Sequence, residues 1–327
     1  MLYRRLGKTG REVSAIGFGA WAIGGGWGSV DDAASLRALH AAADAGVTLY
    51  DTADVYGDGL SEQLIGRFLR ERSGEKMFVA TKMGRRVPVE MENYAPEAFR
   101  GWIDRSRDNL GVDRLDLVQL HCLHPSIYYS PEHFAALDDL VKAGVIANYG
   151  VSVERVEEAL KAVEFPGVAS VQIIFNMVRQ RPAERFLIEA KRRDVGVLAR
   201  VPLASGLLTG KLTKDSKFEE SDHRAFNRHG EAFDVGETFA GVDYDTGLAF
   251  VEEVRALVPE GATLAQLALR WILMNDGVTA AIPGAKTPEQ ARANAAAADL
   301  AALSPATMQR IAGLYEARIK PLVHQRW

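Results

Sequence analysis

The sequence predicts an α/β protein folded as a (β/α)8 barrel, in which eight parallel strands form a closed ring inside a layer of helices. Two observations support this prediction. Short apolar runs rich in β-forming residues alternate with amphipathic stretches along nearly the whole chain, which is typical of repeated βα units and a parallel sheet. The apolar runs also number eight, as a barrel of this type requires. We therefore expect residues 1–327 to form one barrel domain.

The elements follow in order along the chain. Residues 2–14 have the pattern of a hairpin that turns at residues 8–10 and could cover the bottom of the barrel. Helix starts are predicted at Asp31 and Ser61. The predicted strands are Ala15–Phe18, Thr48–Asp51, Phe78–Thr81, Leu115–Leu120, Ala147–Val151, Val168–Ile174, Val195–Ala199 and Val278–Ile282. Helical periodicity marks the stretches 31–45, 61–72, 96–110, 131–143, 153–163 and 183–193.

One long segment falls outside this repeat. Residues 213–245 are rich in Gly, Asp, Phe and His and show no firm period. Loops of this length in a compact enzyme are usually functional or disordered. The pattern predicts either a long ordered loop or a mobile cover on the face of the barrel where the strands end.

Composition and charge limit the class of protein. The net charge is −4, and the 39 Lys plus Arg residues are interspersed with the 43 Asp plus Glu residues. This pattern argues against a nucleic-acid partner, which usually requires a concentrated basic surface. No apolar run approaches the roughly 18 residues of a membrane span, and residues 1–7 lack the apolar core of a secretory signal. We expect a cytoplasmic protein without a membrane partner.

The cysteine and histidine content favours neither a disulfide nor a metal site. Cys122 is the one cysteine, so it cannot form an internal disulfide or a CxxC metal site. It follows His121 directly, but neighbouring side chains on a strand point to opposite faces, so a buried thiol is favoured over a nucleophilic Cys/His pair. The seven histidines show no ligand spacing, and no metal is predicted.

Polar side chains follow three successive predicted strands, at the barrel end where the loops converge. Asp51 and Tyr56 follow the second strand, Lys82 the third and His121 the fourth. Each residue alone has an ordinary explanation, as a turn aspartate, a packed tyrosine, a solvated lysine or a hydrogen-bonded core histidine. Their joint placement favours a common site.

These four residue types suit the polarisation and protonation of a carbonyl group. A tyrosine with a pKa near ~10 is a poor proton donor at neutral pH, and we expect the ammonium group of Lys82 to lower the pKa of Tyr56. Asp51 could pair with Lys82, and His121 could donate a second hydrogen bond to the carbonyl oxygen. Side chains cannot donate hydride, so such a reaction requires a nicotinamide or flavin cofactor.

The sequence closely resembles the aldo-keto reductase family over almost its whole length, including bacterial members and relatives of the potassium-channel β subunit. Five segments resemble the motifs of this family, in the family's order. They are Leu49–Gly57 (LYDTADVYG), Ala80–Lys82 (ATK), Leu117–His121 (LVQLH), Pro202–Lys211 (PLASGLLTGK) and Ile282–Gln290 (IPGAKTPEQ).

The resemblance implies reduction of a small aldehyde or ketone with NADPH, and a catalytic set of Asp51, Tyr56, Lys82 and His121 in which Tyr56 is the general acid. It also implies a cofactor extended across the barrel top, and substrate contacts from Trp21, Tyr56 and His121. The implied cofactor positions are Gly19, Ala20, Trp21, Asp51, Ser152, Gln172, Arg200, Val201, Pro202, Leu203, Ser205, Gly206, Leu208, Gly210, Lys211, Ile282, Pro283, Gly284, Lys286, Gln290 and Asn294.

The resemblance also divides these positions among the parts of the cofactor. It places Ser152 and Gln172 at the nicotinamide carboxamide, residues 202–211 at the pyrophosphate, and Gly284, Lys286, Gln290 and Asn294 at the adenosine end. Lys286 directly precedes a predicted helix start, where free backbone N–H groups favour an anion. A lysine there can neutralise a 2′-phosphate, which favours NADP over NAD.

Two positions depart from the common family pattern. Val153 stands where many members have asparagine, so one amide contact to the nicotinamide is missing or replaced. Arg200 stands where many members have an aromatic residue that stacks on the nicotinamide ring, although a guanidinium can also lie against a ring or reach a phosphate. The loops that carry His124, Tyr128 and Tyr129 and residues 226–229 are further candidates for the substrate pocket.

Three other interpretations remain open from the sequence. Residues 17–22 fit the GxGxxA pattern of a dinucleotide-binding Rossmann fold, but the glycine-rich stretch Gly24–Gly28 delays the helix that should follow directly. The same family fold also serves as a cofactor-sensing regulatory subunit with slow turnover. The same site can also run as an NAD(P)-dependent sugar or alcohol dehydrogenase in the oxidative direction.

Overall fold

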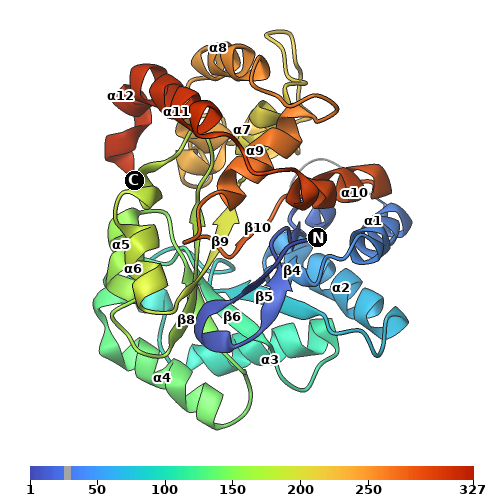
Figure 1. The fold of residues 1–327 in the computed structure, drawn as a ribbon. Helices are drawn as coiled ribbons and strands as arrows, with labels where there is room; N and C mark the ends of the chain where they lie inside the picture. Colours follow the sequence, from blue (N-terminus) through green and yellow to red (C-terminus); the bar gives the residue numbers. More distant parts are fainter. Residues whose placement is uncertain (26–30) are drawn as a thin grey trace.

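A computed structural model describes residues 1–25 and 31–327 of the chain. Its main sheet has eight parallel strands in the order β10-β9-β8-β7-β6-β5-β4-β3, so each strand pairs with its neighbour in the sequence (Figure 1). The strands are β3 (Phe18–Gly19), β4 (Leu49–Asp51), β5 (Phe78–Met83), β6 (Leu117–His121), β7 (Tyr149–Ser152), β8 (Val168–Ile174), β9 (Gly196–Arg200) and β10 (Ala280–Ala281).

Isolated bridges join the two edges of this sheet. Ile16 bridges Ala281, and Gly19 bridges Gly284, both in the parallel sense. The backbones approach closely at Gly19, where a Cβ atom would lie 2.6 Å from the carbonyl oxygen of Ile282. The predicted (β/α)8 barrel is therefore confirmed, although its first and last strands are shorter than predicted.

Helices form the outer layer around the sheet. The main helices are α1 (Asp32–Asp44), α2 (Leu60–Glu71), α3 (Ala98–Leu110), α4 (Pro131–Lys142), α5 (Val156–Ala162), α6 (Phe186–Arg192), α8 (Tyr244–Arg255), α9 (Leu264–Leu273), α10 (Pro288–Ala296) and α11 (Pro305–Leu314). Two short helices are α7 (His223–Phe226) and α12 (Lys320–Val323). Figure 1 shows α8, α11 and α12 gathered at one side of the barrel.

The helix starts agree in part with the prediction. Asp31 caps α1, because its carboxylate accepts hydrogen bonds from the backbone N–H groups of Ala33 and Ala34. Ser61 is not a cap: α2 begins at Leu60, and the Ser61 hydroxyl donates to the carbonyl oxygen of Ala20 over 3.1 Å. The glycine-rich stretch Gly24–Gly28, which was expected to delay the helix that follows, lies partly outside the described residues.

The predicted N-terminal hairpin covers one end of the barrel. It consists of β1 (Tyr3–Arg5) and β2 (Glu12–Ser14), which pair antiparallel. Leu6 and Val13, both fully buried, pack into one cluster with apolar side chains from inside the barrel, including Leu49 and Phe78. Because Leu49 and Phe78 begin their strands, the hairpin closes the end opposite to the loops that carry the polar motifs.

Residues 213–245 form an ordered loop of short helical turns over the other end. The side chain of Asn227 is fully buried, and its Oδ1 accepts from the backbone N–H groups of Ala232 and Phe233. The hydroxyl of Ser205 donates to the carbonyl oxygen of Glu237 over 3.0 Å, which ties this segment to the loop after β9. The sequence predicted either a long ordered loop or a mobile cover, and the structure shows the ordered loop.

Candidate active site

The four candidate catalytic residues meet at the carboxyl ends of β4, β5 and β6. Asp51 ends β4, Lys82 lies near the end of β5, His121 ends β6, and Tyr56 lies in the loop after β4, in the turn η3 (Tyr56–Gly59). Lys82 is the centre of the group. Its Nζ donates to Asp51 Oδ2 and to the carbonyl oxygen of Thr52, both over 2.7 Å, and to the Tyr56 hydroxyl over 3.3 Å.

Burial and charge fix the protonation states of Lys82 and Tyr56. Burial lowers the pKa of Lys82, but Asp51 and Tyr56 outweigh this effect and hold the pKa above its ordinary value. Burial raises the pKa of Tyr56, and the opposing effect of Lys82 is smaller. The expectation that Lys82 would bring the pKa of Tyr56 below its ordinary value is therefore wrong for this state. The Tyr56 hydroxyl keeps its proton at neutral pH.

His121 is a neutral imidazole beside Tyr56. Only 5% of its surface is exposed, and its ring meets the Tyr56 ring edge-on, with 5.8 Å between the ring centroids. Burial, followed by Arg85, Lys82 and Arg200, holds the pKa of His121 well below its ordinary value. Its Nδ1 has no hydrogen-bond partner among the described residues. The ring can therefore donate one neutral N–H bond from Nε2.

A chain of buried amides holds Asp51 from the far side of the barrel. Gln172, on β8, donates from Nε2 to Asp51 Oδ1 over 2.8 Å and to Gln119 Oε1 over 3.0 Å. Gln119, on β6, donates in turn to the hydroxyl of Ser170 over 2.9 Å. Sequence reasoning missed Gln119 and Ser170, although both are polar residues inside otherwise apolar strands, which is the signal that could have identified them.

The two residues predicted for the carboxamide lie on adjacent strands, because Ser152 of β7 pairs with Gln172 of β8. The hydroxyl of Ser152 lies 3.6 Å from the Cys122 sulfur. Both N–H groups of the Gln172 amide are used by protein acceptors, which leaves its Oε1 as the group that can accept a bond from a ligand amide.

Aromatic side chains surround Tyr56 on its open side. The Trp21 ring stacks on the Tyr56 ring at 6.1 Å, lies 4.7 Å from the His223 ring, and meets Phe233 edge-on at 6.0 Å. Trp21 thus lies beside the candidate catalytic residue Tyr56. Sequence reasoning did not single out His223 or Phe233, because both belong to the segment without periodicity.

The other residues predicted for the substrate pocket are divided between the interior and the surface of the protein. The hydroxyl of the fully buried Tyr128 is 3.4 Å from the carbonyl oxygen of Ser152, whereas Tyr129 is 64% exposed. His124 caps the turn η5 (Pro125–Tyr129). Within residues 226–229, Phe226 is exposed but meets Phe233 edge-on, and the guanidinium of Arg228 lies over the rings of Phe239 and Tyr244.

Arg200 is held by protein carboxylates and carbonyls. Its Nη2 lies 2.8 Å from Glu154 Oε2 and donates to the carbonyl oxygen of Val153 over 3.2 Å, and its Nη1 lies 3.6 Å from Glu237 Oε1. The two departures from the family pattern are therefore in contact, because the backbone of Val153 binds the guanidinium of Arg200. Glu154 and Glu237 were not identified from the sequence.

The loop after β9 has a backbone suited to an anion. Val201, Ala204, Ser205 and Gly206 all have positive φ angles, of 50°, 46°, 54° and 92°. Ala204, Ser205 and Gly206 are consecutive, and turns of this kind bind phosphate groups through backbone N–H groups in other proteins. Here the N–H groups of Ala204 and Gly206 donate to the carbonyl oxygens of Val201 and Leu203. The remaining predicted cofactor positions lie in or directly beside this loop and the loops after β3 and β10. They are Gly19, Ala20, Pro202, Leu203, Leu208, Gly210, Lys211, Ile282 and Pro283.

Two cations lie near this loop. The Arg224 guanidinium lies 3.5 Å from the carbonyl oxygen of Ser205, and its Nη2 is 2.6 Å from Asp222 Oδ2. Lys286 is half-buried, and burial lowers its pKa while the neighbouring Asp222 opposes this effect. Asp222 and Arg224 were not among the predicted residues, and their segment shows no motif that could have identified them.

The loop from Gly284 to Lys286 is fixed by α10, whose first residues follow it. Gln290 Oε1 accepts from the backbone N–H of Lys286 over 2.8 Å, and Asn294 donates to the carbonyl oxygen of Gly284 over 3.1 Å. Thr287 caps α10 by accepting from the backbone N–H of Gln290. The predicted residues Lys286, Gln290 and Asn294 therefore lie together.

Cys122, Glu154 and Glu237 are a group of the described residues that could supply metal ligands, with ligand atoms within 4.8 Å of one another. Arg200 already lies 2.8 Å from Glu154, and Arg85 Nη1 lies 2.9 Å from Glu237 Oε1. Two guanidinium groups thus occupy the positions from which the carboxylates would bind a cation, so we assign no metal to this group.

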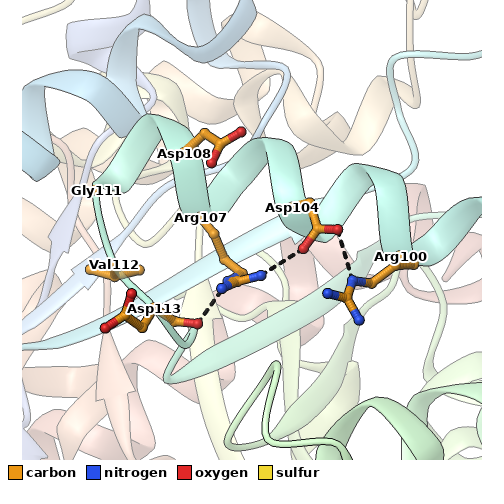
Figure 2. A pocket seen from close by; sticks show the side chains of 7 residues that line it. All are labelled: Arg100, Asp104, Arg107, Asp108, Gly111, Val112 and Asp113. Atoms are coloured by element: carbon orange, nitrogen blue, oxygen red, sulfur yellow. Dashed lines mark hydrogen bonds and ion pairs between the residues drawn. The ribbon is translucent and has the colours of Figure 1, made fainter.

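A hollow of about 450 Å³ lies elsewhere, on the outside of α3 (Figure 2). Its charged side chains bind one another: Asp104 pairs with Arg100 and Arg107, both over 2.7 Å. The hollow extends to Asp113, just before the start of β6, and so lies toward the barrel end opposite to Tyr56. We do not assign a ligand to it. Among the described helices, none has the length and apolar character to cross a membrane.

Residues 15–316 match the aldo/keto reductase family. The chain is 31% identical over 299 residues to the aldo-keto reductase YhdN of Bacillus subtilis, covering 90% of this chain and 87% of that protein. It is 29% identical to the NADH-specific methylglyoxal reductase of Escherichia coli, covering 90% and 93% of the two chains. The structure of a glycerol dehydrogenase from Gluconobacter oxydans superposes with a TM-score of 0.79 at 29% identity, covering 97% and 95%.

Proposed function

This chain belongs to the aldo/keto reductase family, and we propose that it reduces an aldehyde or ketone with NADPH, using Tyr56 as the proton donor. The observation that carries the proposal is the position of the Tyr56 hydroxyl, 3.3 Å from the buried ammonium group of Lys82 and beside the neutral ring of His121. This arrangement offers one transferable proton next to a fixed positive charge.

Each side chain has a chemical role in this scheme. The Tyr56 hydroxyl donates its proton to the carbonyl oxygen, and the Lys82 ammonium stabilises the phenolate that remains. His121 donates a hydrogen bond from Nε2 to the same oxygen. Asp51 acts as a positioning residue, because it holds Lys82 Nζ over 2.7 Å and does not contact Tyr56 through a hydrogen bond of its own. The cofactor supplies the hydride.

The residues present fit a dinucleotide cofactor. The consecutive positive φ angles of Ala204, Ser205 and Gly206 and the nearby cations Arg224 and Lys286 suit a pyrophosphate or phosphate group. Gln172 Oε1 on β8 and Ser152 at the end of β7 suit the nicotinamide carboxamide. We propose Gly284, Gln290 and Asn294 as the residues around the adenosine.

The preference for NADPH rests on Lys286. Its side chain is half-buried just before the start of α10, where the charges of Asp222 and Arg224 act on its ammonium group. A second phosphate on the ribose would add a charge-assisted hydrogen bond there. The Escherichia coli relative is described as NADH-specific, so the preference for NADPH is a specific property that needs its own measurement.

The protonation of Tyr56 favours the reductive direction. Burial raises the pKa of Tyr56, so the phenol is ready to donate a proton at neutral pH, whereas oxidation of an alcohol requires the phenolate. The relative from Gluconobacter oxydans is named as a glycerol dehydrogenase, so the oxidative reaction is the comparison to measure.

The experiment is to follow NADPH or NADH absorbance with the purified protein and a panel of aldehydes and ketones, and NADP⁺ reduction with polyols. Carbonyl-dependent consumption of NADPH that is faster than that of NADH supports the proposal. Faster reduction of NADP⁺ with a polyol would instead support a dehydrogenase. Binding of NADPH without turnover of any compound would support a cofactor-sensing subunit and overturn the proposal.

A further inference from the structure

Arg85 belongs to the group of side chains around Tyr56, although the reaction proposed above gives it no role. It lies two residues beyond the end of β5, at the same barrel end as Tyr56 and His121. Its guanidinium lies 5.5 Å from the centre of the Phe233 ring, and Phe233 contacts Trp21, which stacks on Tyr56. After burial, the charge of Arg85 is the strongest influence that lowers the pKa of His121.

The guanidinium of Arg85 has unused donors. Nη1 donates to Glu237 Oε1 over 2.9 Å, and no other hydrogen bond joins the guanidinium to a residue that the structure describes. Nε and Nη2 therefore offer two parallel N–H groups along one edge, the arrangement that binds both oxygens of a carboxylate. The side chain is only 18% exposed, so water satisfies these donors less fully than it would at the surface.

The positive charges of Arg85 and Arg200 are only partly neutralised by the two carboxyl groups near them. Arg85 and Arg200 both approach Glu237, at 2.9 and 3.6 Å, and they lower its pKa to about 2, although burial opposes them. Glu154 is the second carboxyl of the cluster, with an oxygen within 4.8 Å of one on Glu237. Burial raises the pKa of Glu154 to about 7, although Arg200 opposes this effect. Near neutral pH the two carboxyls therefore hold part of a proton between them, and the two guanidinium groups are not fully neutralised.

We infer that Arg85 is an anion-binding residue of the substrate site, and that the preferred substrates are aldehydes or ketones that carry a carboxylate. The inference rests on the proposed function. The carbonyl group lies at Tyr56 and His121, and the carboxylate accepts hydrogen bonds from Nε and Nη2 of Arg85. The apolar part of the molecule packs against Trp21 and Phe233.

The experiment compares each carboxylate substrate with its neutral methyl ester. Succinic semialdehyde is paired with methyl 4-oxobutanoate, and 4-carboxybenzaldehyde with methyl 4-formylbenzoate, so two spans between carbonyl and carboxylate are covered. For the wild-type protein with NADPH, we expect kcat/KM for the acid to exceed that for the ester by about 10-fold or more in at least one pair. Most of the difference should lie in KM, because a hydrogen bond to a charged group contributes binding free energy of this size.

Three variants test the residue assignment. Arg85→Gln should reduce the acid-to-ester ratio about 10-fold or more, whereas Arg86→Gln should leave it unchanged, because Arg86 pairs with Asp58 at the surface. Glu237→Gln should raise the ratio, because it removes the carboxylate that competes for Arg85. A general loss of folding cannot produce these opposite changes.

A binding measurement complements the rates. Calorimetric titration of the NADPH complex with 4-(hydroxymethyl)benzoate should show binding that Arg85→Gln weakens about 10-fold and Arg86→Gln leaves intact. A wild-type ratio at or below one in both pairs, equal effects of the two arginine variants, or a lower ratio in Glu237→Gln would overturn the inference while leaving the reductase proposal intact. Failure to reduce any of the four compounds would overturn the inference alone if other aldehydes or ketones of the panel are reduced, and both proposals if none is.

Discussion

Gln172 Nε2 donates to one oxygen of Asp51 over 2.8 Å, while Lys82 Nζ approaches the other oxygen over 2.7 Å. The carboxylate is thus held between β8 and β5, on two sides of the barrel. Because Lys82 is also bound to the carbonyl oxygen of Thr52, its ammonium group has little freedom to move relative to the Tyr56 hydroxyl.

The bond from Gln172 should therefore affect both stability and activity. Gln172→Leu leaves one buried oxygen of Asp51 without a partner, and we expect the free energy of unfolding to fall by roughly 1–3 kcal/mol. We also expect kcat to fall about tenfold, because Asp51 no longer holds Lys82 in one orientation. Urea unfolding and steady-state kinetics measure the two effects. Gln119→Leu is the control: similar destabilisation with an equal loss of kcat would show that Gln172 has only a structural role.

Tyr56→Phe should abolish most of the reduction without preventing cofactor binding. The substitution removes the proton donor and little volume, and general acid catalysis typically contributes 10²–10⁴-fold, so we expect kcat to fall by about that factor. The NADPH dissociation constant, measured by fluorescence, should change by less than about threefold. Tyr129→Phe, at an exposed position, is the matched control. Wild-type turnover in Tyr56→Phe would refute the assigned mechanism.

The pH dependence of reduction should follow the protonated phenol. Since burial raises the pKa of Tyr56 above its ordinary value, the acid form persists throughout the neutral range and is lost only as the pH rises through that raised pKa. The rate of a single turnover should stay constant between about pH 6 and pH 9. A decline centred near pH 7 would assign the proton to another group.

Lys286→Ala should weaken NADPH more than NADH. The Lys286 side chain is half-buried within the electrostatic influence of Asp222 and Arg224. Loss of a charge-assisted contact to the 2′-phosphate should raise the NADPH dissociation constant about tenfold. Lys214→Ala, a surface lysine that is 77% exposed, controls for the loss of one positive charge. Equal weakening of both cofactors would remove the 2′-phosphate contact from the proposal.

Asp54 should make stability depend on pH. Burial and the nearby Glu62 raise its pKa to about 7, and its Oδ1 is buried with no partner among the described residues. The folded state therefore binds this proton more tightly than the unfolded chain, so its contribution to stability is lost as the pH rises from about 4 to 7. Asp54→Asn should stabilise the protein by roughly 1–3 kcal/mol at pH 8 and by less at pH 5, measured by urea unfolding. An equal effect at both pH values would contradict the assigned cause.

The sequence predicted those parts of the molecule that depend on local pattern. The eight strands were visible as apolar runs, and Asp51, Lys82 and His121 could be placed at strand ends because parallel strands of one barrel all end on the same side. Tyr56 was found because it lies in a recognisable motif five residues after Asp51.

Other features depend on residues far apart in the chain and left no local signal. In the structure Arg200, at the end of β9, pairs with Glu154, which follows β7 on the far side of β8. Phe233 and Glu237 reach the site from the segment without periodicity. The pKa of Tyr56 was misjudged because burial, which outweighs Lys82, is a property of the folded surroundings rather than of the neighbouring residues.

The seam that joins residues 16–19 to residues 281–284 has a consequence for the order in which the protein matures. A chain emerging from the ribosome brings out Asp51, Tyr56, Lys82 and His121 early, but the ring cannot close until its last strand has been synthesised. Pairings of such long sequence separation form late, because the chain entropy of the loop must first be overcome. A nascent chain that stops before residue 281 therefore exposes open sheet edges, which are sites for association with other chains.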